Sequence, residues 1–439
     1  MLGPQGTLFF VLLVAVFAGL MVWLAVTKQV VLRVVAAVLA FLPAMVFGVG
    51  VVNKYYDYYQ SWGALFSDLS GQGAQSIPQV TAAGLGKDTG KSVSSILKDS
   101  TNSVLDSQTG YLFRTMVAGP KSHVTREVYV WLPPQYFSRA YASYKFPAIE
   151  LLHGSPGNPE SWVNVMNVLT IYLQQLQSHK AQPAVLVMPD TDGGEKYGLQ
   201  CLNNPGGIQD MTFVGKEDPD WVAANLRVEP PGPAWGVAGY SEGGYCAANI
   251  GLQYAARFGY AGSLSGYFQP ITSQVPLHNK PGGPPVRVNV FAHSRGLRIR
   301  NSPDKYILQI PIGVQVPQFF LAAGALDTED VQGAEAFRQL LLTRVANVPL
   351  DIVPGGGHQA TVWRSSLADL LPWMTDQQAV EVQKLTANAA AHQREVEQAQ
   401  AKAHPLTAHP LLPNPTQPNA GLTHQVPSQS TLPAVGGRP

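Results

Sequence analysis

The sequence predicts an α/β fold with a mostly parallel central sheet, preceded by a two-helix transmembrane hairpin. Two observations predict the sheet. Short apolar strands alternate with helix-length segments, and a pattern typical of an antiparallel β-hairpin comes before them. A third observation predicts the transmembrane pair, because the first fifty residues are almost wholly apolar.

The composition limits the possible partners and cofactors. The chain has 439 residues, enough for one domain of ordinary size with appendages. Its formal net charge is +1, so no overall field attracts it to nucleic acid. The two cysteines are too few for a zinc cluster or a disulfide scaffold. We therefore expect no nucleic-acid partner, no metal and no other cofactor.

Residues 1–53 are predicted to form the transmembrane hairpin, with spans at about 8–26 and 30–52. Each span has the roughly 20 residues needed to cross about 30 Å of hydrocarbon. A cleaved signal peptide is the main alternative for the first span. Against it, no basic segment precedes the span, and a second span follows at once. A hairpin buried in a soluble core is the other alternative.

The charges near the hairpin predict its orientation in the cell membrane. Lys28 and Arg33 are the basic residues at the connector end, and the positive-inside rule places them in the cytoplasm. The rest of this multi-pass protein then lies on the extracytoplasmic side. Residues 54–107 begin with an aromatic stretch suited to the outer interface and continue as a polar linker.

Residues 108–375 are predicted to form the α/β domain, which opens with the β-hairpin. Six further strands are expected at Ala148–Leu152, Ala184–Met188, Trp235–Gly239, Tyr260–Leu264, Gln318–Ala323 and Leu350–Val353. Helices are expected at Ser161–Ser178, Glu242–Arg257, Asp330–Val345 and Ala360–Met374. After the domain we expect an exposed helix at 376–403 and a disordered, Pro-rich tail at 404–439.

Ser241 lies at the centre of a Gly-x-Ser-x-Gly pattern that runs from Gly239 to Gly243. The pattern follows an apolar strand and precedes a helical segment, which is the setting of a nucleophile elbow. The two glycines are expected to permit the strained turn of that elbow. A serine that merely caps a helix is the alternative. The setting predicts that Ser241 is the nucleophile of an α/β-hydrolase fold.

His358 is the best-placed candidate for the general base. It follows the last predicted strand in a turn of three glycines, and it comes after Ser241, as the base does in this fold. A surface loop histidine is the alternative. His153 precedes Ser241 in the chain, so a role in shaping its loop is expected instead.

The orienting carboxylate should follow the strand that ends near residue 326. Asp327 is the first carboxylate after that strand and is our choice, with Glu329 as the second candidate. Asp330 is expected to begin the following helix as an N-terminal charge.

An oxyanion hole requires two N–H donors near the nucleophile. The backbone amides of Ser155, in a Gly-rich bend after a strand, and of Glu242 are the candidates. Cys201 and Cys246 are both expected near the active-site end of the sheet, and an extracellular location would let them form a disulfide.

Segment 270–315 is rich in Pro and Gly and contains Arg295, Arg298 and Arg300. We expect it to form a lid or rim beside the active site. A solvated loop is the plain interpretation of the arginines, and binding of an anionic head group is a weaker hypothesis.

With these residues the chain resembles the Putative esterase family, which includes esterase D and the mycobacterial mycolyltransferases. The similarity covers roughly 128–373. It rests on five segments, Leu151–Gly154, Met188–Asp190, Val222–Gly244, Gly262–Gly266 and Gly355–His358. The hairpin and the Tyr-rich stretch look like those of actinobacterial membrane-anchored esterases. The resemblance implies acyl-ester chemistry outside the cell through Ser241, an acidic residue and His358, without a metal.

The chain departs from the mycolyltransferases at positions that bear on the acceptor. They carry an Asp where this chain has His153 and an Arg where it has Pro156, and both of those residues touch the sugar. They also use a Glu as the triad acid, where this chain offers Asp327 first. These differences favour hydrolysis over transfer to trehalose.

We therefore expect a membrane-anchored extracytoplasmic serine esterase that hydrolyses acyl esters through an acyl-enzyme. The expected partners are the lipid bilayer and an acyl-ester substrate, such as a cell-envelope lipid or glycolipid. One alternative is an acyltransferase that moves an acyl chain to a cell-envelope alcohol. The other is a non-catalytic binding domain on the same fold.

Overall fold

The computed structural model describes residues 3–70, 108–193, 200–205, 207–277 and 286–403. The chain up to Ala387 forms one unit, and the second unit begins within the last helix. Most of the predicted linker and the whole predicted tail lie outside the described residues.

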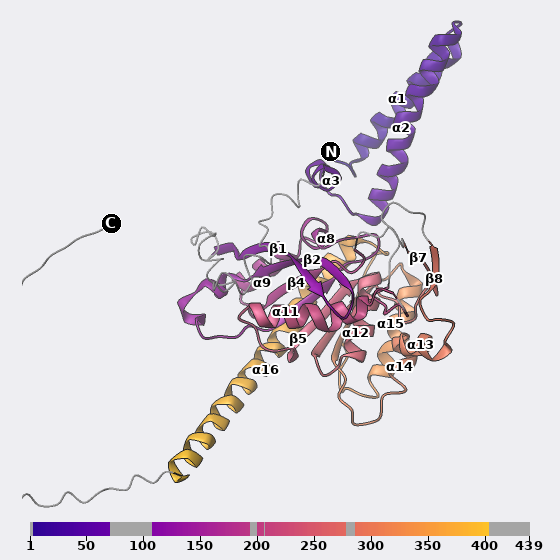
Figure 1. Cartoon of the computed structure of the whole chain (residues 1–439). Coiled ribbons are helices and arrows are strands. Elements are labelled where there is room, and N and C mark those ends of the chain that lie inside the picture. The colour runs from indigo at the N-terminus through magenta and orange to yellow at the C-terminus, as the bar shows by residue number, and fades with distance from the viewer. Residues whose placement is uncertain (1–2, 71–107, 194–199, 206, 278–285, 404–439) are drawn as a thin grey trace, which may run out of the picture. The chain divides into compact units, whose positions relative to one another are not determined.

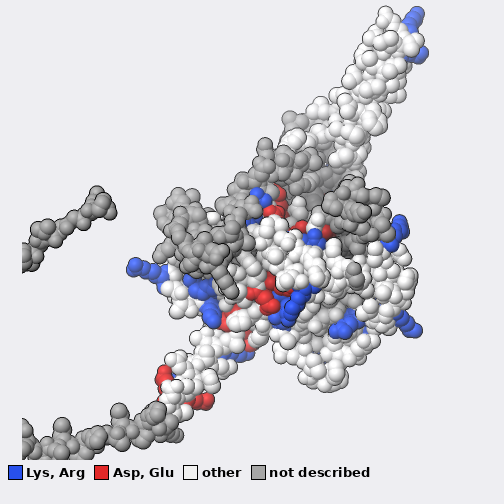
Figure 2. Space-filling view, viewed as in Figure 1, with Lys and Arg blue, Asp and Glu red and all other residues white. Residues whose placement is uncertain are grey.

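The N-terminal helices α1 (Thr7–Val26) and α2 (Val30–Tyr56) run side by side (Figure 1). Both are long and apolar enough to cross a membrane. Figure 2 shows an uncharged surface along the hairpin below the basic groups at its tip. The hairpin thus has the composition of a membrane anchor, with α2 continuing four residues beyond the predicted span.

The segment after α2 differs from the predicted aromatic stretch and linker. Residues Trp62–Ser70 form a helix, α3, which the sequence analysis did not predict. The ring of Trp62 contacts Phe9 of α1 edge-on at 5.0 Å and stacks on Phe66 at 6.0 Å. These aromatic contacts give the start of the predicted linker a packed position.

The domain is built on an eight-stranded sheet of order β1-β2-β4-β3-β5-β6-β9-β10. β1 pairs antiparallel with β2, and β2 with β4, while the remaining pairs are parallel. The strands are β1 Tyr111–Gly119, β2 Val124–Leu132, β3 Ala148–Leu152, β4 Val185–Pro189, β5 Gly232–Tyr240, β6 Phe258–Leu264, β9 Gln318–Gly324 and β10 Leu350–Val353. The mostly parallel sheet predicted from the sequence is confirmed.

Helices cover both faces of the sheet. Side chains of α9 and α16 contribute to the core on one face, and those of α12 and α15 to the core on the other. The helices are α8 Glu160–Asn164, α9 Val168–Gln177, α10 Asp210–Thr212, α11 Asp218–Asn225, α12 Glu242–Gln253, α13 Arg295–Arg300, α14 Pro303–Tyr306, α15 Thr328–Leu341 and α16 Ala360–Ala403. A separate antiparallel ribbon consists of β7 Gln274–Leu277 and β8 Val286–Asn289.

Two predicted helices differ from the observed ones. The single helix expected at Ser161–Ser178 is divided into α8 and α9, because Asn167 takes a left-handed conformation with φ 54°. The boundary expected after residue 375 is absent, since α16 continues without a break. Its side chains still reach the core as far as Val382, which is 2% exposed.

Gln378 explains why α16 stays on the domain beyond the predicted boundary. Its fully buried amide nitrogen donates to the carbonyls of Ala148 in β3 and Ala234 in β5, both at 3.0 Å. These carbonyls lie near the beginnings of the two central strands. The helix α16 therefore links β3 and β5 at their amino ends, at the end of the sheet opposite Ser241.

Gln378→Ala is expected to lower the free energy of unfolding by about 2 kcal/mol, because two buried carbonyls lose their donor. The measurement is the shift in thermal unfolding of the detergent-solubilised protein. Gln377→Ala is the matched control, since the Gln377 amide bonds only to Trp373 of its own helix. Equal losses in the two variants would contradict this role of Gln378.

Candidate active site

Ser241 lies between the end of β5 and the start of α12, in the turn that the sequence predicts. Its backbone is strained, with φ 54° and ψ −121°, and its amide donates to the Leu264 carbonyl at 2.8 Å. Strain of this kind is held in place by the surrounding structure and occurs at functional sites. The side chain is thereby presented at the carboxyl end of the sheet.

The flanking glycines are required for a reason other than the predicted one. Neither Gly239 nor Gly243 has a positive φ. A Cβ on Gly239 would lie 2.2 Å from the Gly243 carbonyl oxygen, and one on Gly243 would lie 2.0 Å from that of Leu152. The motif therefore needs glycine because the elbow's backbone packs directly against itself and against β3.

His358 lies in the loop between β10 and α16 and faces Ser241. Its Nε2 is 2.9 Å from Ser241 Oγ, although 117 residues separate them. The loop is held against the end of β9, where the Leu326 amide donates to the Gly356 carbonyl at 2.7 Å. The ring of Trp363 contacts the imidazole edge-on at 5.2 Å. These contacts fix the imidazole beside the serine.

Two carboxylates, rather than one, face the other side of the imidazole. Asp327 Oδ2 is 3.0 Å from His358 Nδ1, and Asp330 Oδ2 is 2.8 Å from the same atom. Asp327 caps α15 through its contact with the Asp330 amide, and Asp330 lies in the first turn of that helix. Because Nδ1 carries one hydrogen, the two carboxylates share it.

The place of Asp330 corrects the expectation that it serves only as a helix N-terminal charge. It does occupy the first turn of α15, but its side chain also bonds to His358. The signal in the sequence was its spacing of three residues after Asp327, which puts both side chains on one side of a helical turn. Glu329, the second candidate for the acid, is exposed and has no recorded contact with His358.

These neighbours change the proton affinity of the imidazole and of Asp330. Burial lowers the pKa of His358, but the bond and charge of Asp330, with those of Asp327, outweigh it and raise the pKa above 6.5. Burial, together with the nearby Asp327, raises the pKa of Asp330 despite the opposing effect of His358. The site thus stabilises an imidazolium, which is what a general base becomes.

Among the described residues, one group has donor atoms close enough together to hold a metal ion. It consists of Asp327, Asp330 and His358. The same atoms are engaged with one another, because both carboxylates bond to Nδ1 while Nε2 contacts Ser241. This donor set fits a hydrogen-bonded relay to the serine.

The loop after β3 passes beside Ser241. A Cβ on Gly154 would lie 3.2 Å from Ser241 Cβ, so the backbone that leads to Ser155 is adjacent to the serine. His153 is buried and shapes this loop, since its Nδ1 contacts the Gly154 carbonyl at 2.9 Å and its Nε2 accepts from the Thr191 amide at 3.1 Å. The structure therefore places His153 in a loop contact and His358 at the serine.

Glu242 follows Ser241, and its side chain is 7% exposed. Its carboxyl oxygen accepts a hydrogen bond of 3.0 Å from the backbone amide of Gln200. Burial, aided by the charge of Asp192, raises the pKa of Glu242 to about 8. At neutral pH this carboxyl is therefore mostly protonated and adds little negative charge at the start of α12.

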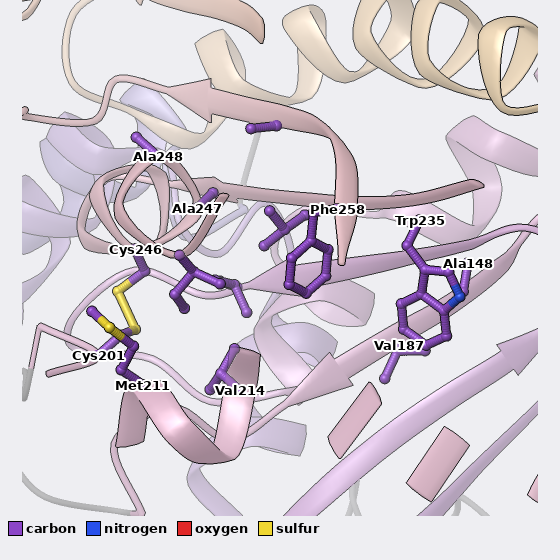
Figure 3. Close-up of a cluster of buried hydrophobic side chains, with 14 of the residues drawn as sticks. Ala148, Val187, Cys201, Met211, Val214, Trp235, Cys246, Ala247, Ala248 and Phe258 are labelled. Atoms are coloured by element: carbon purple, nitrogen blue, oxygen red, sulfur yellow. A yellow bond between two sulfur atoms is a disulfide. The ribbon is translucent and has the colours of Figure 1, made fainter. Parts of the chain in front are cut away.

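A disulfide joins Cys201 to Cys246, the pair that the sequence predicted. Figure 3 shows it among buried apolar side chains, between the loop that carries Cys201 and the helix α12. The Cα atoms are 5.6 Å apart. With the Gln200–Glu242 bond it attaches this loop to the first turns of α12, just beyond Ser241.

The arginines of segment 270–315 do not gather at Ser241 as a group. All three lie on the exposed helix α13. Arg300 bonds to Gln253, the last residue of α12, whereas Ser241 precedes the first. The 12 residues of α12 at 1.5 Å each put about 18 Å between its ends. The predicted rim position is therefore wrong for Arg300.

Comparison with known proteins shows the family and the fold of the chain. The family described as Putative esterase matches residues 122–374, more than half of the chain. A solved ferulic acid esterase has the same fold, with a TM-score of 0.51 and 20% identity over 62% of this chain and 99% of its own.

The similar sequences come from actinobacteria. An uncharacterised protein of Corynebacterium glutamicum is 23% identical over 287 residues, which are 63% of this chain and 64% of that protein. The MPT51 antigen of Mycobacterium leprae is 43% identical over 81 residues, 18% of this chain and 26% of the antigen. The chain thus spans under two thirds of each relative. Because the family match covers more than half of the chain, the protein belongs to the Putative esterase family.

Proposed function

We propose that the protein is a membrane-anchored serine esterase that cleaves acyl esters on the extracytoplasmic side of the cell membrane. The observation that carries the proposal is the hydrogen-bonded relay from Ser241 through His358 to Asp327 and Asp330. A nucleophile, a base and an orienting carboxylate in this order are what acyl transfer to serine requires. Family membership supports ester substrates.

In the proposed reaction, Ser241 Oγ attacks the ester carbonyl while His358 Nε2 takes its proton. The carboxylates hold the Nδ1 hydrogen, so the imidazole presents an unprotonated Nε2 to the serine. The imidazolium then returns the proton to the leaving alcohol, and an acyl-enzyme forms on Ser241. Water, activated by the same imidazole, releases the acid.

The backbone amides of Ser155 and Glu242 are proposed to stabilise the oxyanion. Their positions support this role. Ser155 follows Gly154, whose backbone lies close to Ser241, and Glu242 is the first residue of α12. A donor of this kind contributes on the order of 3 kcal/mol to transition-state stabilisation. A protonated Glu242 carboxyl avoids placing a full negative charge beside the developing one.

Acyl transfer to a cell-envelope alcohol would use the same acyl-enzyme and differ in the second step. An alcohol would then replace water at the acyl carbon. The non-catalytic alternative predicted that a member of the relay would be missing, whereas Ser241, His358 and a carboxylate are in contact. The contacts favour an enzyme over a binding domain. His153 and Pro156, at the positions where the mycolyltransferases touch the sugar, favour esterase activity over acyl transfer.

The hairpin and the disulfide support the proposed location. Two helices are apolar and long enough to span a bilayer. Lys28 and Arg33 lie near their connector, against the single Lys54 at the other end of α2. A disulfide persists in an oxidising compartment, which agrees with an extracytoplasmic domain.

A fluorophosphonate probe is expected to label the full-length protein in detergent, because the relay makes Ser241 nucleophilic. Labelling should disappear in Ser241→Ala. Ser155→Ala retains the backbone amide and should still be labelled. A folded wild-type protein that resists the probe would refute the proposed activity.

Asp327→Asn and Asp330→Asn are each expected to lower kcat/KM by about tenfold, because the remaining carboxylate still holds the His358 tautomer. The double variant should lose on the order of 10⁴-fold, as when a triad acid is removed. Glu329→Gln, at the exposed neighbour, is the matched control and should be unchanged. A full loss in either single variant would show that the carboxylates do not share this role.

The pH profile of kcat/KM should have two limbs. Activity falls towards acid as His358 is protonated, with the limb above pH 6.5 because its pKa is raised. It falls towards alkali as pH passes about 8, where Glu242 ionises beside the oxyanion. Glu242→Gln, which keeps an acceptor for the Gln200 amide, should remove the alkaline limb and leave the acid limb. An alkaline limb unchanged by that substitution would disprove the assignment.

A further inference from the structure

The last residues of the hairpin make direct contact with the catalytic domain. The Asp57 carboxylate forms an ion pair with the Arg364 guanidinium, and these side chains are only 12% and 13% exposed. Arg364 also donates to the Val165 carbonyl at 2.7 Å. The Tyr58 hydroxyl donates to the Pro156 carbonyl at 3.3 Å. We call Asp57 and Tyr58 the hairpin clamp.

The clamp contacts segments that border the active site on two sides. Arg364 follows Trp363, whose ring stacks on Tyr240 at 4.7 Å and meets the His358 ring. Pro156 follows Ser155 in the loop whose Gly154 approaches Ser241. The clamp therefore reaches segments adjacent to the general base and to the oxyanion loop.

The connection from the apolar span to the clamp is short and ordered. α2 ends at Tyr56, and Asp57 terminates it in a left-handed conformation, φ 51° and ψ 38°. The Asn53 side chain bonds to both the amide and the carbonyl of Tyr59, at 2.8 and 3.0 Å. The Gln5 side chain donates to the same carbonyl at 3.2 Å. The domain is thus held at the end of the span before the polar linker begins.

The length of this connection sets the height of the domain above the hydrocarbon. Asp57 lies five positions beyond Val52, the last residue of the apolar run. At 1.5 Å per helical residue the clamp lies about 8 Å beyond that run. The headgroup layer on each side of a bilayer is roughly 5–8 Å thick. A span embedded in hydrocarbon therefore brings the clamped segments to the headgroup surface.

We propose that the hairpin clamp holds the mouth of the active site against the bilayer, so that the ester reaching Ser241 is carried by a lipid of that membrane surface. This inference rests on the proposed esterase function and assigns its substrate class. The ester groups of membrane lipids lie at the boundary between headgroups and hydrocarbon. A domain held at this height meets such an ester without extracting the whole lipid, whereas a domain on a long linker would not.

The test uses the full chain in vesicles of phosphatidylglycerol and phosphatidylethanolamine. One substrate is p-nitrophenyl acetate, which dissolves in water, and the other is 4-methylumbelliferyl oleate embedded in the vesicles. The double variant Asp57→Asn, Tyr58→Phe removes the ion-pair charge and the hydroxyl. We expect its turnover of the embedded ester to fall at least fivefold, while turnover of the soluble ester stays within twofold.

Glu381→Gln is the control, because it removes the exposed ion pair with Lys384 and should leave both activities unchanged. Equal rates on the embedded ester for wild type and double variant would overturn the proposal. So would an equal fall on both substrates, which indicates damage to the site itself. Fluorophosphonate labelling in detergent separates the two proposals. If the wild-type protein is labelled but the double variant behaves like it on the embedded ester, only the lipid substrate is refuted. If the wild-type protein is not labelled, the esterase function itself is refuted.

Discussion

The hydrogen bond between His358 Nε2 and Ser241 Oγ is the contact on which the site depends. It joins two loops 117 residues apart, at 2.9 Å. The contact requires the carboxyl ends of β5, β9 and β10 to lie on one edge of the sheet, which their parallel pairing through β6 provides. The fold therefore serves chiefly to bring the serine, the acids and the base to one edge.

Two aspartates on one imidazole nitrogen distinguish this site from a simple three-residue relay. The second carboxylate is available because Asp327 caps α15 and Asp330 occupies its first turn. The two acids raise the pKa of His358, whereas burial, together with the neighbouring Asp327, raises the pKa of Asp330. Both carboxylates contact the His358 imidazole, and burial raises the pKa of Glu242, the residue after Ser241, to about 8.

The sequence predicted the strands and the turn that holds Ser241 well, because both depend on local patterns. The β5–Ser241–α12 turn follows from an apolar strand, a short Gly-rich motif and a helical segment. The double carboxylate was missed because its geometry depends on where His358 lies, and chain order alone does not show which of Asp327, Glu329 and Asp330 face the imidazole. Gly239 and Gly243 permit the turn through close backbone contacts with each other and with β3, and such contacts are not visible in a sequence.

Helix ends and the membrane-proximal segment were predicted least well. α16 continues because Gln378 finds two carbonyls on distant strands, and α3 forms because Trp62 meets Phe9. Both are tertiary contacts that override local composition. The same is true of the ion pair of Asp57, whose partner Arg364 lies 307 residues away.

The central claim is that an acyl group resides on Ser241 during turnover. Its most direct measurement is mass spectrometry of the full-length protein quenched in acid while it hydrolyses a slowly released p-nitrophenyl ester. The account predicts one acyl group per chain, in the peptide that contains Ser241. Turnover with no adduct, or with the acyl group on another residue, would contradict it.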